Sequence, residues 1–228
     1  MEYVDVARAT SERGEVVLRE RLEDPSVSSG SPPILELRVN GVFVMDTHET
    51  GSERGLATVA LSQVPDARHV LVAGLGLGFT MHEVLADPRV ERLDVVEIEG
   101  ALVRWMRDGT VPYGPAWLAD ERVNVVIADV RAAIAAAEPE TYDLIVLDVD
   151  NGPGFLVYEG NAAVYQREFL ARACSCLREK GGLVIWSSAE SLTLKAELGA
   201  VFGDVHAVPF DVALQRHEER YWIYLARR

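Results

Sequence analysis

The chain has few cysteines, little positive charge and no long apolar run. Its 228 residues include two cysteines, and 22 basic side chains stand against 36 acidic ones, which gives a formal net charge of −14. Charge of this sign repels nucleic-acid phosphates at long range. No apolar run approaches the roughly 20 residues that a membrane helix needs, and the chain does not begin with a basic-then-apolar signal peptide. We therefore expect a cytoplasmic protein that binds neither nucleic acid nor membrane and acts on a cationic or neutral small molecule.

The two cysteines do not form a disulfide framework or a zinc site. Cys174 and Cys176 lie two residues apart in a segment with a helical pattern, so their side chains point to different faces. Hydrophobic residues make up 49% of the chain and charged residues 25%, which is typical of a globular protein with a proper core. We expect both cysteines to pack in or near that core.

The first part of the chain predicts a small β-rich unit. Strand-like runs lie on both sides of Asn40-Gly41, a strong signal for a two-residue hairpin, and a Ser/Gly/Pro-rich loop is predicted at 26–33. Thr50, with Glu53 three residues later, predicts a capping box that opens a linking helix. We take residues 1–65 as this unit together with its helix.

The second part, residues 66–228, alternates apolar strands with helical stretches. This alternation predicts a parallel sheet with helices on both faces. The tail has two β-rich runs around the polar segment 215–219, which predicts an antiparallel hairpin at the sheet edge. The five apolar runs span 70–74, 93–99, 123–129, 142–150 and 181–188, and a long helix is predicted at 162–179.

A glycine-rich turn follows the first apolar run. Gly74, Gly76 and Gly78 allow a tight turn that brings backbone N–H groups close to a nucleotide-like ligand. Glu97 ends the next run about 20 residues later, where an acid accepts hydrogen bonds from ribose hydroxyls. The alternative is that these glycines only pack a helix on the sheet. Phe79 replaces the third glycine of a dinucleotide fingerprint, and a triphosphate-binding loop is missing, which leaves an S-adenosyl ligand.

Together these segments resemble the spermidine synthase-like (polyamine aminopropyltransferase) branch of the class I S-adenosylmethionine-dependent methyltransferase superfamily. The resemblance implies an α/β, Rossmann-like class I methyltransferase fold: a mostly parallel seven-stranded sheet, last strand antiparallel, with a small N-terminal β domain. It also implies a homodimer. It rests on ILELRVNGVFVMD, HVLVAGLGLGFTMHEVL, VERLDVVEIEGALV, VNVVIADVRAAI, YDLIVLDVDNGPG and CLREKGGLVIWSS, which cover most of the chain.

The resemblance also implies roles for individual residues. Glu97 would hold the cofactor ribose, and Asp129 would receive the adenine amino group unless it only caps the following helix. Asp148, which follows the fourth strand, would orient or deprotonate an attacking amine; a purely structural acid is the alternative. The cofactor's amino acid part and sulfonium would lie beside the glycine turn, Gly74, Gly76, Leu77 and Gly78.

Part of the diamine-binding set of that branch is missing. Asn151 stands where a diamine-binding carboxylate is expected, and Asp150 is displaced from that place by one position. The branch's Tyr-His-Glu run appears as residues 53–55, Glu-Arg-Gly, and its hairpin glutamine appears as Val44. His48, Glu49, Ser52 and Glu53 could contact substrate, although a turn and a helix cap explain them nearly as well.

Leu77 replaces the acid that meets the ammonium of decarboxylated S-adenosylmethionine in that branch. Without this acid, S-adenosylmethionine should bind at least as tightly as its decarboxylated form. Free N–H groups around Gly76 and Gly78 would receive its carboxylate. Leu77→Asp should then weaken S-adenosylmethionine selectively.

Two tyrosines follow the expected catalytic loop. Tyr158 and Tyr165 could form an aromatic wall beside a sulfonium or ammonium, although Tyr165 could equally be a core residue. With Asp150 and Asn151 they are the candidate substrate residues. A magnesium ion at Asp148, Asp150 and Asn151 would need ligands from several elements, so we expect no metal.

The leading hypothesis is a methyltransferase that uses S-adenosylmethionine on a small molecule, with Asp148 orienting the nucleophile or accepting its proton. The first alternative is a polyamine aminopropyltransferase that uses decarboxylated S-adenosylmethionine. The second is a cofactor-binding module without turnover, which the presence of Gly74, Glu97, Asp129 and Asp148 disfavours.

Overall fold

The computed structural model describes residues 2–22, 32–214 and 217–228, so most of the predicted loop at 26–33 lies outside it. Its first part is a four-stranded antiparallel sheet in the order β1-β2-β3-β4. Asn40 and Gly41 have positive φ angles of 52° and 77° and join β3 to β4, which confirms the predicted hairpin turn. The strands are β1 (Glu2–Ser11), β2 (Gly14–Leu22), β3 (Ile34–Val39) and β4 (Val42–Asp46).

A seven-stranded sheet forms the second part, in the order β10-β11-β9-β8-β5-β6-β7. Strands β5 to β9 pair with one another in parallel, whereas β11 is antiparallel to both β9 and β10. This confirms the predicted α/β fold and its antiparallel last strand. The strands are β5 (His69–Ala73), β6 (Arg92–Glu97), β7 (Val123–Ile127), β8 (Tyr142–Leu147), β9 (Leu177–Ser187), β10 (Val205–Leu214) and β11 (His217–Arg227).

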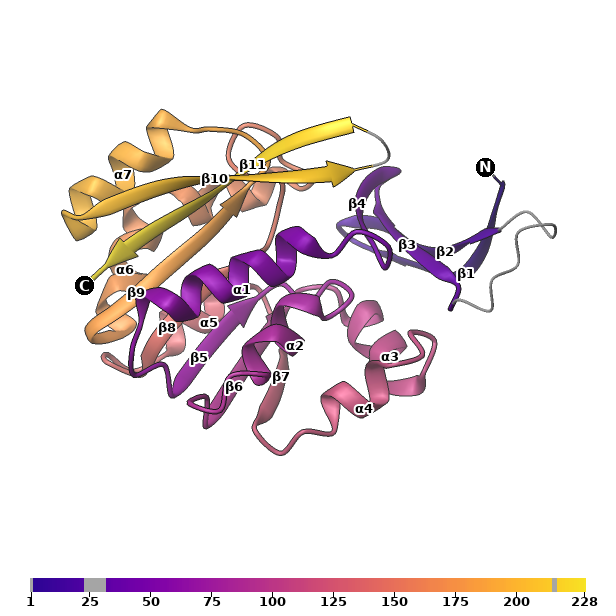
Figure 1. Cartoon of the computed structure of the whole chain (residues 1–228), viewed down its shortest axis with the longest axis horizontal. Coiled ribbons are helices and arrows are strands. Elements are labelled where there is room, and N and C mark those ends of the chain that lie inside the picture. Colours follow the sequence, from indigo (N-terminus) through magenta and orange to yellow (C-terminus); the bar gives the residue numbers. More distant parts are fainter. Residues whose placement is uncertain (1, 23–31, 215–216) are drawn as a thin grey trace.

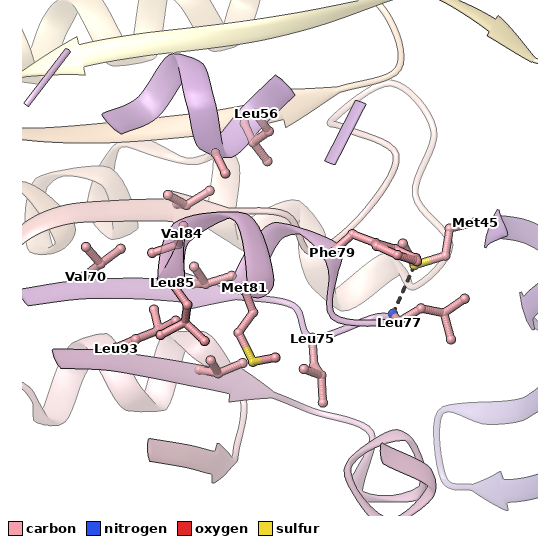
Figure 2. Close-up of a cluster of buried hydrophobic side chains, with 14 of the residues drawn as sticks. Met45, Leu56, Val70, Leu75, Leu77, Phe79, Met81, Val84, Leu85 and Leu93 are labelled. Carbon is pink, nitrogen blue, oxygen red and sulfur yellow. Dashed lines mark hydrogen bonds between the residues drawn. The ribbon is translucent and has the colours of Figure 1, made fainter. Parts of the chain in front are cut away.

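Helices cover both faces of this sheet (Figure 1). Val70 and Val72 of β5 face a cluster that includes the first helices, whereas Leu71 and Ala73 face the helices of the other side, because neighbouring side chains of a strand point to opposite faces. Figure 2 shows α2 packed between β5 and Leu56 of α1. The helices are α1 (Gly51–Gln63), α2 (Phe79–Leu85), α3 (Gly100–Asp108), α4 (Gly114–Leu118), α5 (Val130–Ala136), the 3-10 helix η1 (Glu159–Tyr165), α6 (Arg167–Cys176) and α7 (Leu192–Phe202).

The small sheet shares its core with the large one. Val16, Leu37 and Met45 of the small sheet belong to the same buried cluster as the residues of α1 and α2. The small sheet lies beyond the carboxyl ends of the parallel strands (Figure 1). Helix α1 packs on α2 and the large sheet. The two parts therefore enclose the space in which the strand ends meet.

Some local predictions were wrong. Thr50 precedes α1 but makes no side-chain cap, and Glu53 accepts a hydrogen bond from Ser52 instead. The long helix predicted at 162–179 is divided into η1 and α6. It also ends early, at Cys176, because Leu177 already pairs with Tyr142 of β8 as the first residue of β9. The predictions also omitted β1, α4 and α7. The tail hairpin is present: β10 ends at Leu214, β11 begins at His217 within the expected polar segment, and residues 215–216 lie outside the described part.

The cysteines lie on α6, Cys176 buried and Cys174 half-buried. Among the described residues, no helix is long and apolar enough to cross a membrane. In the same part of the chain, no group of three or more His, Cys, Asp or Glu side chains is placed to hold a metal ion.

Candidate active site

A cavity of about 740 Å³ lies between the carboxyl ends of the parallel strands and the small sheet. Its size is within the range of about 300–1,000 Å³ that is usual for small-molecule sites. The wall includes the glycine turn, the ends of β6, β7 and β8, the β3–β4 hairpin and the start of α1. β5 has β6 on one side and β8 on the other, so the cavity lies at the switch point where α/β sheets bind ligands.

The cavity brings together most of the residues singled out from the sequence. Leu77, Gly78, Tyr165 and His48 are not part of its wall. Tyr165 is buried in the cluster on the face of the large sheet that is opposite to α1 and α2. This agrees with its alternative interpretation as a core residue. The predicted residues that line the cavity are Glu49, Ser52, Glu53, Gly74, Gly76, Glu97, Asp129, Asp148, Asp150, Asn151 and Tyr158.

The glycine turn is locked between the ends of its neighbouring strands. Gly74 has a φ of 92°, and a Cβ there would lie 1.9 Å from the carbonyl oxygen of Asp148. The N–H of Gly74 donates to Val96 of β6, and the N–H of Asp148 donates to Ala73 of β5. A side chain at position 74 would therefore push the turn away from Asp148.

The N–H groups of this turn already have partners within the protein. Those of Leu75 and Gly76 donate to the Glu97 carboxylate, with 2.8 Å for Leu75. The N–H of Leu77 lies 3.2 Å from the Met45 sulfur, and that of Gly78 donates to the Leu75 carbonyl at 2.7 Å. The prediction of free N–H groups around Gly76 and Gly78 is therefore wrong.

Leu77 is a core residue. Its side chain is fully buried, whereas Leu75, two positions earlier, contributes to the cavity wall. Figure 2 shows the two side chains leaving the turn in different directions, with Leu77 beside Met45 of β4. An acid at position 77 would thus enter apolar surroundings in this conformation of the turn.

Glu97 is buried and acts as the anchor of the turn. Besides the turn amides, its carboxylate accepts the N–H of Glu99 at 2.7 Å. Burial raises the pKa of Glu97, and these backbone hydrogen bonds oppose the rise. A carboxylate offers about four acceptor positions, so three backbone donors leave about one for a ligand hydroxyl.

Asp129 caps α5, as its alternative interpretation requires. Its Oδ1 accepts the N–H of Arg131 at 2.8 Å, and the guanidinium of Arg131 holds the pKa of Asp129 below its usual value. The carboxylate also lines the cavity. The Arg131 guanidinium therefore keeps Asp129 ionised, and the cap fixes it at the cavity wall.

Asp148 is half-buried just beyond β8. Its Oδ2 accepts a hydrogen bond of 2.7 Å from the hydroxyl of Thr80, in the first turn of α2. Burial raises the pKa of Asp148 to about 6, and the Thr80 hydrogen bond opposes this rise. Asp148 is therefore largely ionised near pH 7 and suited to accept a proton there. Sequence reasoning missed Thr80, although its position directly after the glycine turn was a usable signal.

Asp150 organises its own loop. Its Oδ1 accepts the N–H groups of Asn151 and Val157, both at 2.7 Å, and its Oδ2 accepts the side-chain amide of Asn161 at 2.8 Å. Among the described residues, Asp148 has no such set of amide donors, and its side chain accepts from the Thr80 hydroxyl. The Asp148 carboxylate therefore has more acceptor positions available for a ligand than the Asp150 carboxylate has.

Arg13 closes one side of the cavity and was also missed. It lies in the β1–β2 turn and donates to the Glu99 carboxylate at 2.6 Å and to the Ile98 carbonyl at 3.0 Å. This contact joins the small sheet to the loop after β6. The cavity wall also includes Glu53, Trp186 and Tyr221, which come from distant segments.

Comparison with known proteins identifies the family of this chain. Residues 49–202 match the spermine/spermidine synthase domain. The chain belongs to this family. A curated family relative, putrescine N-methyltransferase 2 of Nicotiana tabacum, is 35% identical over 136 residues, which are 59% of this chain and 36% of the relative. Polyamine aminopropyltransferase 1 of Hyperthermus butylicus is 32% identical over 184 residues, 78% of this chain and 56% of the relative. The chain thus spans about a third to just over half of these relatives.

Solved structures of spermidine synthases share the fold. The enzyme of Thermotoga maritima has a TM-score of 0.78 and 17% identity, over 98% of this chain and 72% of the other. A spermidine synthase in complex with the transition state analogue AdoDATO has a TM-score of 0.80 and 17% identity, over 98% of this chain and 73% of the other. The predicted family and fold are therefore confirmed.

Proposed function

We propose that this family member is an S-adenosylmethionine-dependent methyltransferase that acts on a small amine. The residues around the cavity fit an S-adenosyl group, because Glu97 retains an acceptor position and Gly74 and Gly76 keep the turn free of side chains. Glu97 would hold the ribose and Asp129 the adenine amino group. When bound, S-adenosylmethionine supplies a methyl group activated by its sulfonium.

Asp148 performs the acid–base part of this function. An alkylamine is largely protonated at neutral pH and has to lose a proton before its nitrogen can act as a nucleophile. Asp148 orients the amine by accepting its N–H and takes up that proton, while Thr80 holds the carboxylate in place. The partly buried site strengthens the attraction between the carboxylate and the ammonium.

One observation carries the preference for methyl transfer. The described glycine turn contributes no acidic side chain to the cavity wall. Gly74, Leu75, Gly76 and Phe79 form this part of the wall. A carboxylate there would repel the carboxylate of S-adenosylmethionine by about 4 kcal/mol at about 4 Å and an effective dielectric near 20. The resemblance places such an acid in aminopropyltransferases. The relatives named putrescine N-methyltransferase support the same preference.

Aminopropyl transfer is the second candidate. It is favoured by the polyamine aminopropyltransferase of Hyperthermus butylicus, whose similarity extends over 78% of this chain. The amine-activating role of Asp148 would be the same. The two candidates differ in whether the cofactor carries a carboxylate.

A competition titration separates them. S-adenosylmethionine and its decarboxylated form are titrated by calorimetry against the wild-type protein, and the products formed with a panel of amines are identified by mass spectrometry. We expect S-adenosylmethionine to bind at least as tightly as its decarboxylated form. We also expect the product to carry an added methyl group. A clear preference for the decarboxylated form, with an aminopropylated product, would replace this proposal by the second candidate.

A further inference from the structure

A second carboxylate faces the cavity beside Asp148. Glu53 lies in the first turn of α1 and is half-buried in the cavity wall. The hydroxyl of Thr80, which donates to Asp148 at 2.7 Å, lies 3.5 Å from the backbone carbonyl of Glu53. Thr80 thus places the start of α1 and the end of β8 next to each other, although these residues are far apart in the sequence.

Glu53 has no cationic partner within the described part of the chain. Its Oε2 accepts the Ser52 hydroxyl at 2.7 Å. The next residue, Arg54, forms an ion pair of 2.9 Å with Glu83 and lies over the ring of Phe79 instead. Burial and repulsion by Asp148 raise the pKa of Glu53 to about 7. Among the described residues, the two neighbouring carboxylates of Glu53 and Asp148 thus have no cationic partner.

The other acids of the cavity wall are engaged by N–H donors of other residues. All of these donors orient the carboxylates, and only Arg13 and Arg131 also bring positive charge, to Glu99 and Asp129. Within the described residues, Glu53 and Asp148 are the two wall acids whose side chains are contacted by other residues through hydroxyl groups alone. The engaged acids are Glu49 with Gly51, Glu97 with Leu75 and Glu99, Glu99 with Arg13, Asp129 with Arg131, and Asp150 with Asn151 and Val157.

Aromatic rings form another part of the same wall. Trp186 of β9 and Tyr221 of β11 pack edge to face with ring centroids 4.8 Å apart, and Phe155 and Tyr158 line the cavity from the loop after β8. Such rings bind apolar groups and the faces of other rings. In the described part of the chain, the cavity therefore combines the Glu53–Asp148 pair of acids with an apolar aromatic surface.

We propose that Glu53 is a specificity-determining residue that holds the acceptor amine together with Asp148. The acceptor then carries a single ammonium group at this pair and an apolar or aromatic body against Trp186 and Tyr221. Asn151 provides no charge for a second ammonium. This inference rests on the proposed function, and it narrows the acceptor to a monoamine.

The test uses the protein loaded with S-adenosylhomocysteine. Calorimetry first measures the affinity for S-adenosylhomocysteine, and then that of the loaded protein for 2-phenylethylamine and for 1,4-diaminobutane. We expect the monoamine to bind more tightly. Glu53→Gln should weaken its binding by about tenfold or more, as is usual for loss of a charged hydrogen bond, with S-adenosylhomocysteine binding unchanged. Glu53→Asp should restore part of the affinity.

Glu168→Gln is the matched control, because Glu168 also lies in the first turn of a helix but is exposed and outside the cavity wall. This variant should bind both ligands like the wild type. Three results would overturn the inference and leave the S-adenosyl site intact. Glu53→Gln could bind the amine as tightly as the wild type does, the loaded wild type could bind the diamine more tightly than the monoamine, or it could bind neither amine. Failure of the wild type to bind S-adenosylhomocysteine would overturn the proposed function itself.

Discussion

Asp148→Asn should lower turnover and stabilise the fold at the same time. The asparagine keeps an oxygen that can accept the Thr80 hydrogen bond but cannot accept a proton. Loss of a general base usually lowers the rate by about 100-fold or more. Binding of S-adenosylhomocysteine should change little, because the proposed ribose contact is made by Glu97 instead.

The stabilising effect follows from the raised pKa of Asp148, from 3.8 to about 6. As the pH rises from 4 through 6, the unfolded chain loses this proton first, so the folded state loses stability. At pH 7 and above the difference costs on the order of 3 kcal/mol, which an uncharged asparagine avoids. In a chain of this length that corresponds to a Tm higher by about 6 to 12 °C. The gain should shrink as the pH falls through 6.

The assay combines thermal unfolding between pH 5.5 and 8 with methyl transfer to an amine that the wild type accepts. The wild-type rate should rise with pH through about 6 as Asp148 ionises, and the variant should lack this rise. A variant that unfolds more easily but keeps its rate would refute the reasoning and make Asp148 a structural acid. A large loss of S-adenosylhomocysteine affinity would instead assign Asp148 to cofactor binding.

Four further predictions can be checked on the same protein. Glu97→Ala should weaken S-adenosylhomocysteine by roughly 2 kcal/mol or more in calorimetry, because it removes a charged acceptor and the anchor of the turn; unchanged affinity would contradict the assignment. Leu77→Asp should lower the Tm instead of acting selectively on one cofactor, since it places an acid in the core. Asp150→Ala should increase proteolysis between residues 151 and 158, because it removes the acceptor that orders this loop; an unchanged cleavage pattern would deny it that role. Light scattering should give a homodimer, and a particle of about 25 kDa at micromolar concentration would rule this out.

The general features of the fold could be predicted because they depend on short-range patterns. Asn40-Gly41 specifies a hairpin through its backbone conformation, and the apolar runs specify buried parallel strands. Gly74 and Glu97 have a spacing that follows from one strand–turn–helix–strand unit. The end of the long helix could not be predicted, because Leu177 is drawn into β9 by pairing with Tyr142, a partner from another strand.

By itself the sequence determined the family, the two sheets and the positions of the acids at the strand ends. Only the tertiary structure decided what each side chain can do. Leu77 faces the core because the turn packs on Met45, and Asp150 serves its loop because Val157 folds back onto it. Glu53 reaches the same cavity as Asp148 only because α1 packs on α2 and the large sheet with its first turn at the cavity. Side-chain periodicity is local and can be read along the chain, whereas hydrogen-bond partners, burial and pKa depend on segments that packing alone brings together.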